Sequence, residues 1–184
     1  MKKAYIFLAN GFEEIEALSP ADILRRAGAD VTLISIEDGL NVTGARGVCV
    51  VCDAMIDDVD LTAADMIILP GGFPGFERLA QCKKVIDTIA FMMENDRYVA
   101  AICGAPAAVL GKNGFLKDRR AVCYPGMEQD MNCKRVHNGH VCADGNVITA
   151  KAAASALDFS FVLCEKLCGI SEANKVRKGI VYDV

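Results

Sequence analysis

Short apolar segments alternate with stretches of helical periodicity along most of this chain of 184 residues. Four segments in which apolar residues predominate lie at 5–9, 31–36, 66–69 and 98–102. Near-continuous apolar runs of this length are typical of strands buried on both faces of a sheet. Strands that alternate with helices favour an α/β domain with a mainly parallel sheet and helices on both faces. We therefore expect one such domain over residues 1–184.

The segments between and after these strands complete the prediction. Further strands are predicted at 47–53, 121–124, 135–142 and 146–150, and helices at 77–95 and 152–167. Asn138-Gly139 and Asp144-Gly145 are strong hairpin signals, so a small antiparallel extension of the sheet is expected. A helix over 13–27 should stop at Gly28, and we expect Pro20 to kink or restart it.

Composition excludes several classes of protein. The hydrophobic fraction of 53% excludes intrinsic disorder, and no apolar run reaches the ~18 residues of a membrane span. The apolar stretch 4–9 after Lys2 and Lys3 is too short for a signal peptide. A net charge of −4 with no basic block argues against a nucleic-acid partner. We expect a cytoplasmic protein with no membrane and no nucleic acid among its partners.

The chain contains nine cysteines. They are Cys49, Cys52, Cys82, Cys103, Cys123, Cys133, Cys142, Cys164 and Cys168. An odd number without a signal peptide argues against a disulfide framework, so we expect reduced thiols, most of them buried as small hydrophobic side chains.

One cysteine stands at a distinctive position. Cys103 directly follows the buried strand at 98–102 and precedes Gly104, Ala105 and Pro106. A strand, a single nucleophile position and a tightly packed helix start make up a nucleophile elbow, with cysteine in place of serine. This layout should expose the thiol and lower its pKa at a helix N-terminus. A core cysteine at the end of a strand fits the same spacing.

Two other strand ends carry polar groups, and in open α/β sheets sites lie at the carboxyl ends of strands. Glu13, Glu14 and Glu16 begin a helix after the first strand, where acidic residues commonly complement the helix dipole. A buried carboxyl aimed at a thiol would instead stay protonated and hydrogen-bond to the sulfur. Gly71 and Gly72 end another strand and form either a simple turn or an oxyanion hole.

Several motifs in register resemble the ThiJ/PfpI superfamily, in the branch of the Parkinson's-disease deglycase protein. The motifs are Ile6-Phe7-Leu8-Ala9-Asn10-Gly11-Phe12-Glu13-Glu14-Ile15-Glu16, Asp22-Ile23-Leu24-Arg25-Arg26-Ala27-Gly28, Ile68-Leu69-Pro70-Gly71-Gly72, Ala100-Ala101-Ile102-Cys103-Gly104-Ala105-Pro106 and Asp144-Gly145-Asn146-Val147-Ile148-Thr149. The resemblance covers nearly the whole chain. It implies a flavodoxin-like, class I glutamine amidotransferase-like fold, a three-layer sandwich.

The resemblance also implies the site and the activity. Cys103 would be the reactive cysteine, Glu16 its protonated carboxyl partner, and Gly71, Gly72 and Gly104 the backbone amides around the pocket. Members are described as cofactor-free glyoxalase III or protein deglycase enzymes that act on small reactive carbonyl compounds or on glycated proteins and thiols. The family is commonly a homodimer, and the expected site holds neither a metal nor a cofactor.

The sequence departs from the family pattern at two places near the expected pocket. Tyr124 stands where many relatives have a histidine, so no dedicated Cys–His dyad is supplied there. Residues 151–155 replace a turn rich in glycine and proline, which changes the expected shape of the pocket. Arg46 matches a family arginine near the dimer interface, and we expect Arg46 and Tyr124 to line the pocket.

Smaller signals suggest two alternative uses of the thiols. Cys49 and Cys52 are spaced as in a C-x-x-C motif, but residues three apart on a strand point to opposite faces. If 135–142 folds as a hairpin, His137, His140 and Cys142 share one face and offer three metal ligands. Cys164 and Cys168 lie on one helix face and are best explained by packing.

Three functions follow from these residues. The first is a cysteine-dependent glyoxalase or deglycase in which Glu16 moves the proton of Cys103. The second is an oxidative-stress sensor or chaperone whose Cys103 oxidises to a sulfinate. The third, an amidase or peptidase, needs a positioned base that Tyr124 does not provide.

Overall fold

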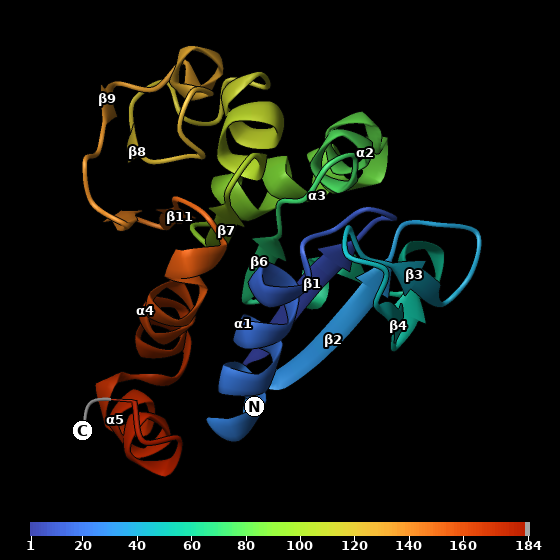
Figure 1. The fold of residues 1–184 in the computed structure, drawn as a ribbon, viewed down its shortest axis with the longest axis vertical. Helices are drawn as coiled ribbons and strands as arrows, with labels where there is room; N and C mark the ends of the chain where they lie inside the picture. Colours follow the sequence, from blue (N-terminus) through green and yellow to red (C-terminus); the bar gives the residue numbers. More distant parts are fainter. Residues whose placement is uncertain (183–184) are drawn as a thin grey trace.

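The computed structural model describes residues 1–182 and is built on a seven-stranded sheet (Figure 1). Its strands are β1 (Lys3–Leu8), β2 (Asp30–Ser35), β5 (Ala54–Met55), β6 (Met66–Leu69), β7 (Tyr98–Ile102), β10 (Val141–Asp144) and β11 (Val147–Ala150). Their order across the sheet is β10-β11-β7-β6-β1-β2-β5. Neighbouring strands are parallel except β10, which pairs antiparallel with β11 at one edge. The predicted mainly parallel sheet with an antiparallel extension is confirmed.

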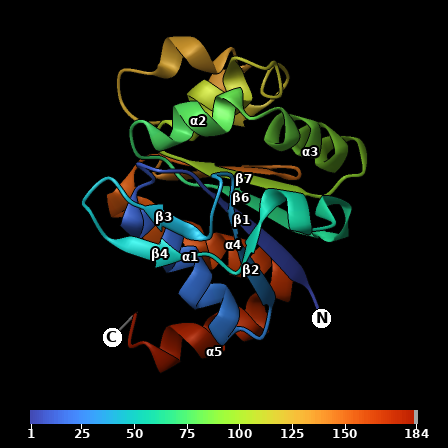
Figure 2. The ribbon, with the colours of Figure 1, turned by 90° about the vertical axis from the view of Figure 1, so that its right-hand side faces the viewer.

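Helices cover both faces of the sheet, which Figure 2 shows edge-on between two helical layers. One layer contains α1 (Glu14–Arg26), α4 (Ala156–Cys168) and α5 (Ile170–Gly179), and the other contains α2 (Gly75–Gln81), α3 (Lys83–Glu94) and the π-helix η3 (Pro106–Gly111). Each layer packs its own core cluster against the sheet. The structure is therefore the expected three-layer, flavodoxin-like α/β sandwich.

The central strands are apolar on both sides because each face of the sheet is covered. Ile6, Ile68 and Ala100 are neighbours in register and belong to the core on the α1 and α4 side. Ile67 and Val99 are also paired and belong to the core on the opposite side. This alternation explains why the sequence shows continuous apolar runs rather than a polar face.

Helix α1 runs without interruption across Pro20, so the predicted restart at this proline is not observed. Proline lacks the N–H that would bond to the carbonyl of Glu16 one turn earlier. The helix continues because Ala17, Ala21 and Leu24 are buried in the core that α1 shares with α4. Its end agrees with the prediction, since Gly28 follows with a φ of +80°.

Two other segments differ from the prediction. Residues 47–53 do not form one strand of the main sheet: β3 (Asn41–Thr43) and β4 (Cys49–Val51) make a separate antiparallel pair, and β5 joins the sheet edge. A tight turn causes this, because the Gly44 N–H donates to the Val48 carbonyl at 2.9 Å. The helix predicted at 77–95 is two helices, interrupted where Cys82 adopts an extended conformation.

The region 120–150 confirms one predicted hairpin and refutes the other. The turn at Asp144-Gly145 joins β10 to β11 as expected. The hairpin at Asn138-Gly139 does not form, because β9 (Arg135–Val136) pairs in parallel with β8 (Arg120–Ala121) instead. Among residues 1–182, none of the helices combines the length and the apolar character that a membrane span requires.

Candidate active site

The topology of the sheet brings three strand ends together. β6 lies between β1 and β7, and all three run in the same direction. The loops that follow Leu8, Leu69 and Ile102 therefore leave the same edge of the sheet, side by side. The chain also reverses its winding here, with β2 on one side of β1 and β6 on the other, which is where open α/β sheets place their sites.

Cys103 occupies a strained turn directly after β7. Its φ of +66° lies in the left-handed region, which side chains other than glycine enter only when the surroundings enforce it. Two backbone hydrogen bonds enforce it: the Cys103 N–H donates to the Ala150 carbonyl at 3.0 Å, and the Tyr124 N–H donates to the Cys103 carbonyl at 2.8 Å. The partly exposed thiol thus stands on a sharp strand-to-helix turn, which has the backbone geometry of an elbow.

Three neighbouring carboxylates of the sequence have three different roles. Glu13 caps α1 by accepting the Glu16 N–H at 2.8 Å. Glu14 accepts the backbone N–H of Arg46 at 2.7 Å and thereby holds the turn that precedes β4. Glu16 alone is fully buried at the site. The pattern of three acidic residues could not distinguish these roles, because they depend on loops distant in sequence.

The carboxyl of Glu16 lies beside the thiol of Cys103. Its Oε2 accepts the Gly71 N–H at 2.9 Å, while the buried Oε1 has no hydrogen-bond partner that satisfies ordinary geometry within residues 1–182. Burial raises the pKa of Glu16 from 4.5 to about 7; the Gly71 hydrogen bond lowers it and the nearby Glu13 charge raises it. A carboxyl of this pKa exchanges protons near neutral pH.

The sequence predicts a lowered pKa for the Cys103 thiol, and this prediction is wrong when Glu16 is ionised. Burial and the negative charge of Glu16 raise the pKa of the Cys103 thiol to about 12. Hydrogen bonds from the backbone N–H groups of Gly104 and Gly72 lower it but do not compensate. The two acids share a small buried volume, and like charges cannot both ionise there at low cost.

Gly71 packs between these two side chains. A Cβ atom at this position would lie 2.5 Å from Cβ of Cys103 and 2.6 Å from Oε2 of Glu16, closer than any real contact. Its N–H is already committed to Glu16. The amides that face the sulfur are those of Gly72 and Gly104.

A cavity of about 650 Å³ opens above the thiol. Its base is formed by Glu16, Gly72, Cys103 and Gly104. Arg46 and Tyr124 line it, together with Glu13 and Ala45. Its apolar residues are Phe73, Phe76, Met127, Ala152, Ala153 and Ala154. The two phenylalanines and Met127 were not predicted from the sequence, although Phe73 directly follows Gly72 and so had to lie at the same sheet edge.

No histidine lines this cavity within the described residues. His137 lies in the loop after β9, where its N–H donates to the Ala121 carbonyl at 2.7 Å. Nδ1 of His140 lies 3.3 Å from the hydroxyl of Ser155. Neither residue takes the place of the histidine that many relatives have at position 124. Among the described residues, this cavity therefore offers no imidazole base for an amidase or peptidase mechanism.

The metal site suggested for His137, His140 and Cys142 required a hairpin that does not form. Across residues 1–182, no group of three histidine, cysteine or acidic side chains is arranged to hold a metal ion. His137, His140 and Cys142 lie in a loop and in β10 rather than across one ribbon, because β9 pairs with β8.

All nine cysteines are free thiols. Cys49 is exposed and Cys52 is buried, as expected for positions three apart on an extended segment. Burial raises the pKa of Cys52 to about 11, so its thiol is not an exposed nucleophile. Cys103 differs from the others by its position, since it combines partial exposure, a strained backbone and a carboxyl neighbour.

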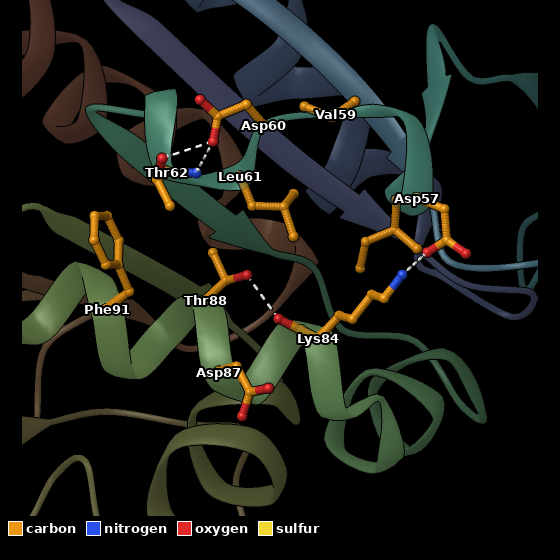
Figure 3. A pocket seen from close by; sticks show the side chains of 10 residues that line it. Asp57, Val59, Asp60, Leu61, Thr62, Lys84, Asp87, Thr88 and Phe91 are labelled. Atoms are coloured by element: carbon orange, nitrogen blue, oxygen red, sulfur yellow. Dashed lines mark hydrogen bonds and ion pairs between the residues drawn. The ribbon is translucent and has the colours of Figure 1, made fainter.

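A second cavity of about 390 Å³ lies between α3 and the loop at 56–62 (Figure 3). Lys84 pairs with Asp57 across it, and the Thr88 hydroxyl donates to the Lys84 carbonyl at 2.6 Å. No cysteine or histidine lines this second cavity. Asp57 pairs with Lys84 and Asp60 accepts from Thr62, so most polar groups here are already bonded and the cavity above Cys103 is the better candidate for chemistry.

Comparison with known proteins identifies the family. The model of the DJ-1/PfpI family matches residues 2–166. The chain belongs to the DJ-1/PfpI family. Among curated DJ-1 proteins, it is 37% identical over 181 residues to Protein DJ-1 homolog B of Arabidopsis thaliana, covering 98% of this chain but 41% of that protein. The chain thus spans about two fifths of the length of this longer relative.

Two further DJ-1/PfpI relatives match over most of their own length. Deglycase PH1704 of Pyrococcus horikoshii is 31% identical over 154 residues, which covers 83% of this chain and 91% of the relative. The structure of oxidized DJ-1 from Toxoplasma gondii superposes with a TM-score of 0.96 at 35% identity and covers 100% of both chains. This DJ-1 likeness agrees with the fold described above.

Proposed function

We propose that this DJ-1/PfpI protein is a cysteine-dependent enzyme of the glyoxalase III or deglycase type that acts on small reactive carbonyl compounds. One observation carries the proposal: a strained, partly exposed Cys103 stands beside a fully buried Glu16 at the base of a cavity. A protonated thiol next to a carboxyl with a pKa of about 7 is a nucleophile with its base in place.

The reaction begins when Cys103 adds to the aldehyde carbon of a 2-oxoaldehyde. The sulfur–carbon bond forms, the carbonyl electron pair moves to oxygen, and the thiol proton passes to Glu16. Backbone N–H groups of Gly72 and Gly104 face the sulfur and would stabilise the oxyanion that develops on the adjacent carbon. Proton return from Glu16 to that oxygen gives a neutral hemithioacetal.

The remaining steps exchange protons and water only. The hydrogen on the former aldehyde carbon is removed as a proton, and the neighbouring carbonyl carbon receives one. The hydroxyl proton of the hemithioacetal leaves its oxygen and the neighbouring oxygen gains one, which leaves a thioester of a 2-hydroxy acid on Cys103. Water then cleaves the thioester and releases the acid and the thiol. One carbon is oxidised and its neighbour is reduced, so the sum is 2-oxoaldehyde plus water to 2-hydroxy acid, and we propose that no cofactor takes part.

The same addition step applies to carbonyl adducts of thiols and amines. The relative from Pyrococcus horikoshii is named a deglycase, which supports glycated thiols or proteins as a further substrate class for this chain. Arg46 and Tyr124 line the cavity and are proposed to contact the substrate near its entrance.

The test is turnover of methylglyoxal, followed as D-lactate. We expect Cys103→Ser to reduce kcat at least 100-fold, because an alcohol adds far more weakly than a thiol, and Cys52→Ser, a buried thiol outside the cavity, to retain turnover. Equal turnover by wild type and Cys103→Ser would overturn the proposal.

A second candidate function is oxidant sensing through the same thiol. It is favoured by the partial exposure of Cys103 and by the description of the Toxoplasma gondii DJ-1 structure as oxidized. Glu16 in its protonated form would donate a hydrogen bond to a sulfinate at this position. Mild peroxide followed by mass spectrometry should then modify Cys103 first, and random modification of all nine cysteines would count against sensing.

We also propose that the protein is a cytoplasmic homodimer. Exposed apolar residues gather where α1 begins and where β4 lies: Ile15 is 55% exposed, Val48 50% and Val51 67%. Glu14 accepts the N–H of both Arg46 and Val48, which holds the start of α1 beside the segment that leads into β4. Exposed apolar surface of this kind is typical of a contact with a second subunit.

A further inference from the structure

We infer that the preferred substrate of the proposed reaction is a 2-oxoaldehyde with an aromatic or extended apolar substituent, rather than a three-carbon compound. This inference rests on the proposed function and names its substrate class. The reacting carbonyl needs only the base of the cavity, where Cys103, Glu16, Gly72 and Gly104 meet. A volume of about 650 Å³ lies within the range of ~300–1,000 Å³ that accommodates drug-sized ligands, far more than methylglyoxal fills.

An aromatic wall, formed by Phe76 and Phe73, begins next to the thiol of Cys103. The ring of Phe76 packs on Gly104, where a Cβ atom would lie 2.7 Å from the ring. Phe73 packs edge-on against Phe76, with ring centroids 6.2 Å apart and an interplanar angle of 60°. A substituent on a carbonyl bound to Cys103 would therefore leave the sulfur along two rings that already have the edge-to-face geometry favoured by aromatic groups.

The wall continues with uncharged side chains from distant parts of the chain. Met127 and the methyl groups of Ala152, Ala153 and Ala154 line the cavity, and Tyr124 adds a ring that is 49% exposed. Phe73 is 67% exposed at the mouth. Covering this apolar surface with an apolar substituent removes it from water, which favours binding.

The charges of the cavity do not suit an ionic substituent along this wall. Of the acidic lining residues, Glu13 already caps α1, and Glu16 is assigned to the thiol proton. Arg46 is the one lining side chain with a positive charge within the described residues. An ionised substituent next to Phe73 and Phe76 would lose hydration, and only a negatively charged one could gain a partner, Arg46.

The experiment compares kcat/KM for phenylglyoxal and methylglyoxal. Wild type is expected to favour phenylglyoxal about tenfold, because burying a phenyl ring against the wall is worth at least ~1.4 kcal/mol, which is tenfold. Phe73→Ala should lower that ratio about fivefold, and Phe73→Leu should restore part of it. Leu40→Ala, an exposed apolar residue outside the cavity, is the matched control and should leave the ratio unchanged.

Each outcome separates the inference from the proposed function. Turnover of both aldehydes with a ratio near one, unaffected by Phe73→Ala, would overturn the apolar preference and leave the enzyme proposal standing. Failure of wild type to convert either aldehyde would overturn both. Phe73→Ala should fold, because the side chain is mostly exposed, and an unchanged thermal midpoint would show that a lower ratio reflects lost contact.

Discussion

At the scale of single residues, Gly71 determines how closely the thiol and the carboxyl approach each other. The absence of a side chain at this position lets Cys103 and Glu16 share one small buried volume. Its N–H fixes one carboxyl oxygen and leaves the other without a conventional hydrogen bond in the described structure. This arrangement combines a thiol of high pKa with a carboxyl that titrates near neutrality.

Gly71→Ala should therefore disrupt both folding and chemistry. The new methyl group would overlap Cβ of Cys103 at 2.5 Å, and the repacking should cost about 1–3 kcal/mol of unfolding free energy. Urea denaturation measures this cost, and turnover should fall in parallel. The matched control is Gly39→Ala, where a Cβ meets nothing within 4 Å. Equal stability of the two variants would contradict the close packing of Gly71 against Cys103 and Glu16.

The buried Glu16 should make stability depend on pH in a defined direction. Its pKa is raised from 4.5 to about 7 on folding, so the native state holds this proton more tightly than the unfolded state. The associated stability is present in full below pH 4.5 and is lost as pH rises through about 7, by roughly 3 kcal/mol.

Urea unfolding of wild type and Glu16→Gln at several pH values tests this linkage. The variant carries no titratable group at this position, so its free energy of unfolding should fall less between pH 4.5 and pH 8 than that of wild type. Parallel curves for the two proteins would mean that Glu16 titrates at its ordinary pKa in the folded state.

At the scale of elements, the buried strands could be predicted because their sequences are locally decisive. The segments at 66–69 and 98–102 contain only side chains that fit a doubly covered sheet, and they form β6 and β7 with the predicted bounds. The elbow followed from the same logic, since Cys103 comes directly after β7. Strand ends that meet at one edge could then be expected to form the site.

The errors arose where local signals compete with contacts distant in sequence. Asn138-Gly139 favours a hairpin, but β9 pairs instead with β8, which consists of residues 120 and 121. Pro20 suits a helix break, but the packing of α1 against α4 keeps the helix continuous. The prediction of a lowered pKa for the Cys103 thiol was wrong for the same reason. The dominant influences on this pKa are burial and Glu16, which lies 87 positions earlier in the sequence.

Helix α4 offers a test of the layered core. Leu163 is fully buried in the cluster shared with α1, and Leu157 on the same helix is 42% exposed. Leu163→Ala should cost about 2–5 kcal/mol of unfolding free energy through lost burial and a residual cavity. Leu157→Ala should cost well under half as much in the same urea titration. Similar costs for both variants would contradict the assigned orientation of the helix.

At the scale of the whole molecule, the exposed apolar patch of Ile15, Val48 and Val51 predicts self-association. Light scattering should give a mass near twice 19.7 kDa for wild type. The double variant Ile15→Asp, Val51→Asp should shift the mass to that of one chain, because two buried charges per subunit would lack partners. Ile170→Asp on α5, at a residue of similar exposure (66%), should remain dimeric. A wild-type mass of one chain would refute the dimer.

The central claim is that Cys103 and Glu16 act as a pair in which the carboxylate suppresses the free thiolate yet accepts the thiol proton during the reaction. The most direct measurement follows two rates in wild type and Glu16→Gln: alkylation of Cys103 by iodoacetamide between pH 7 and pH 10, and turnover of a 2-oxoaldehyde. Removing the Glu16 charge should lower the pKa of Cys103, so alkylation should accelerate, while turnover should fall at least 100-fold because the proton acceptor is lost. If alkylation and turnover instead fall together, or neither changes, the pairing is contradicted.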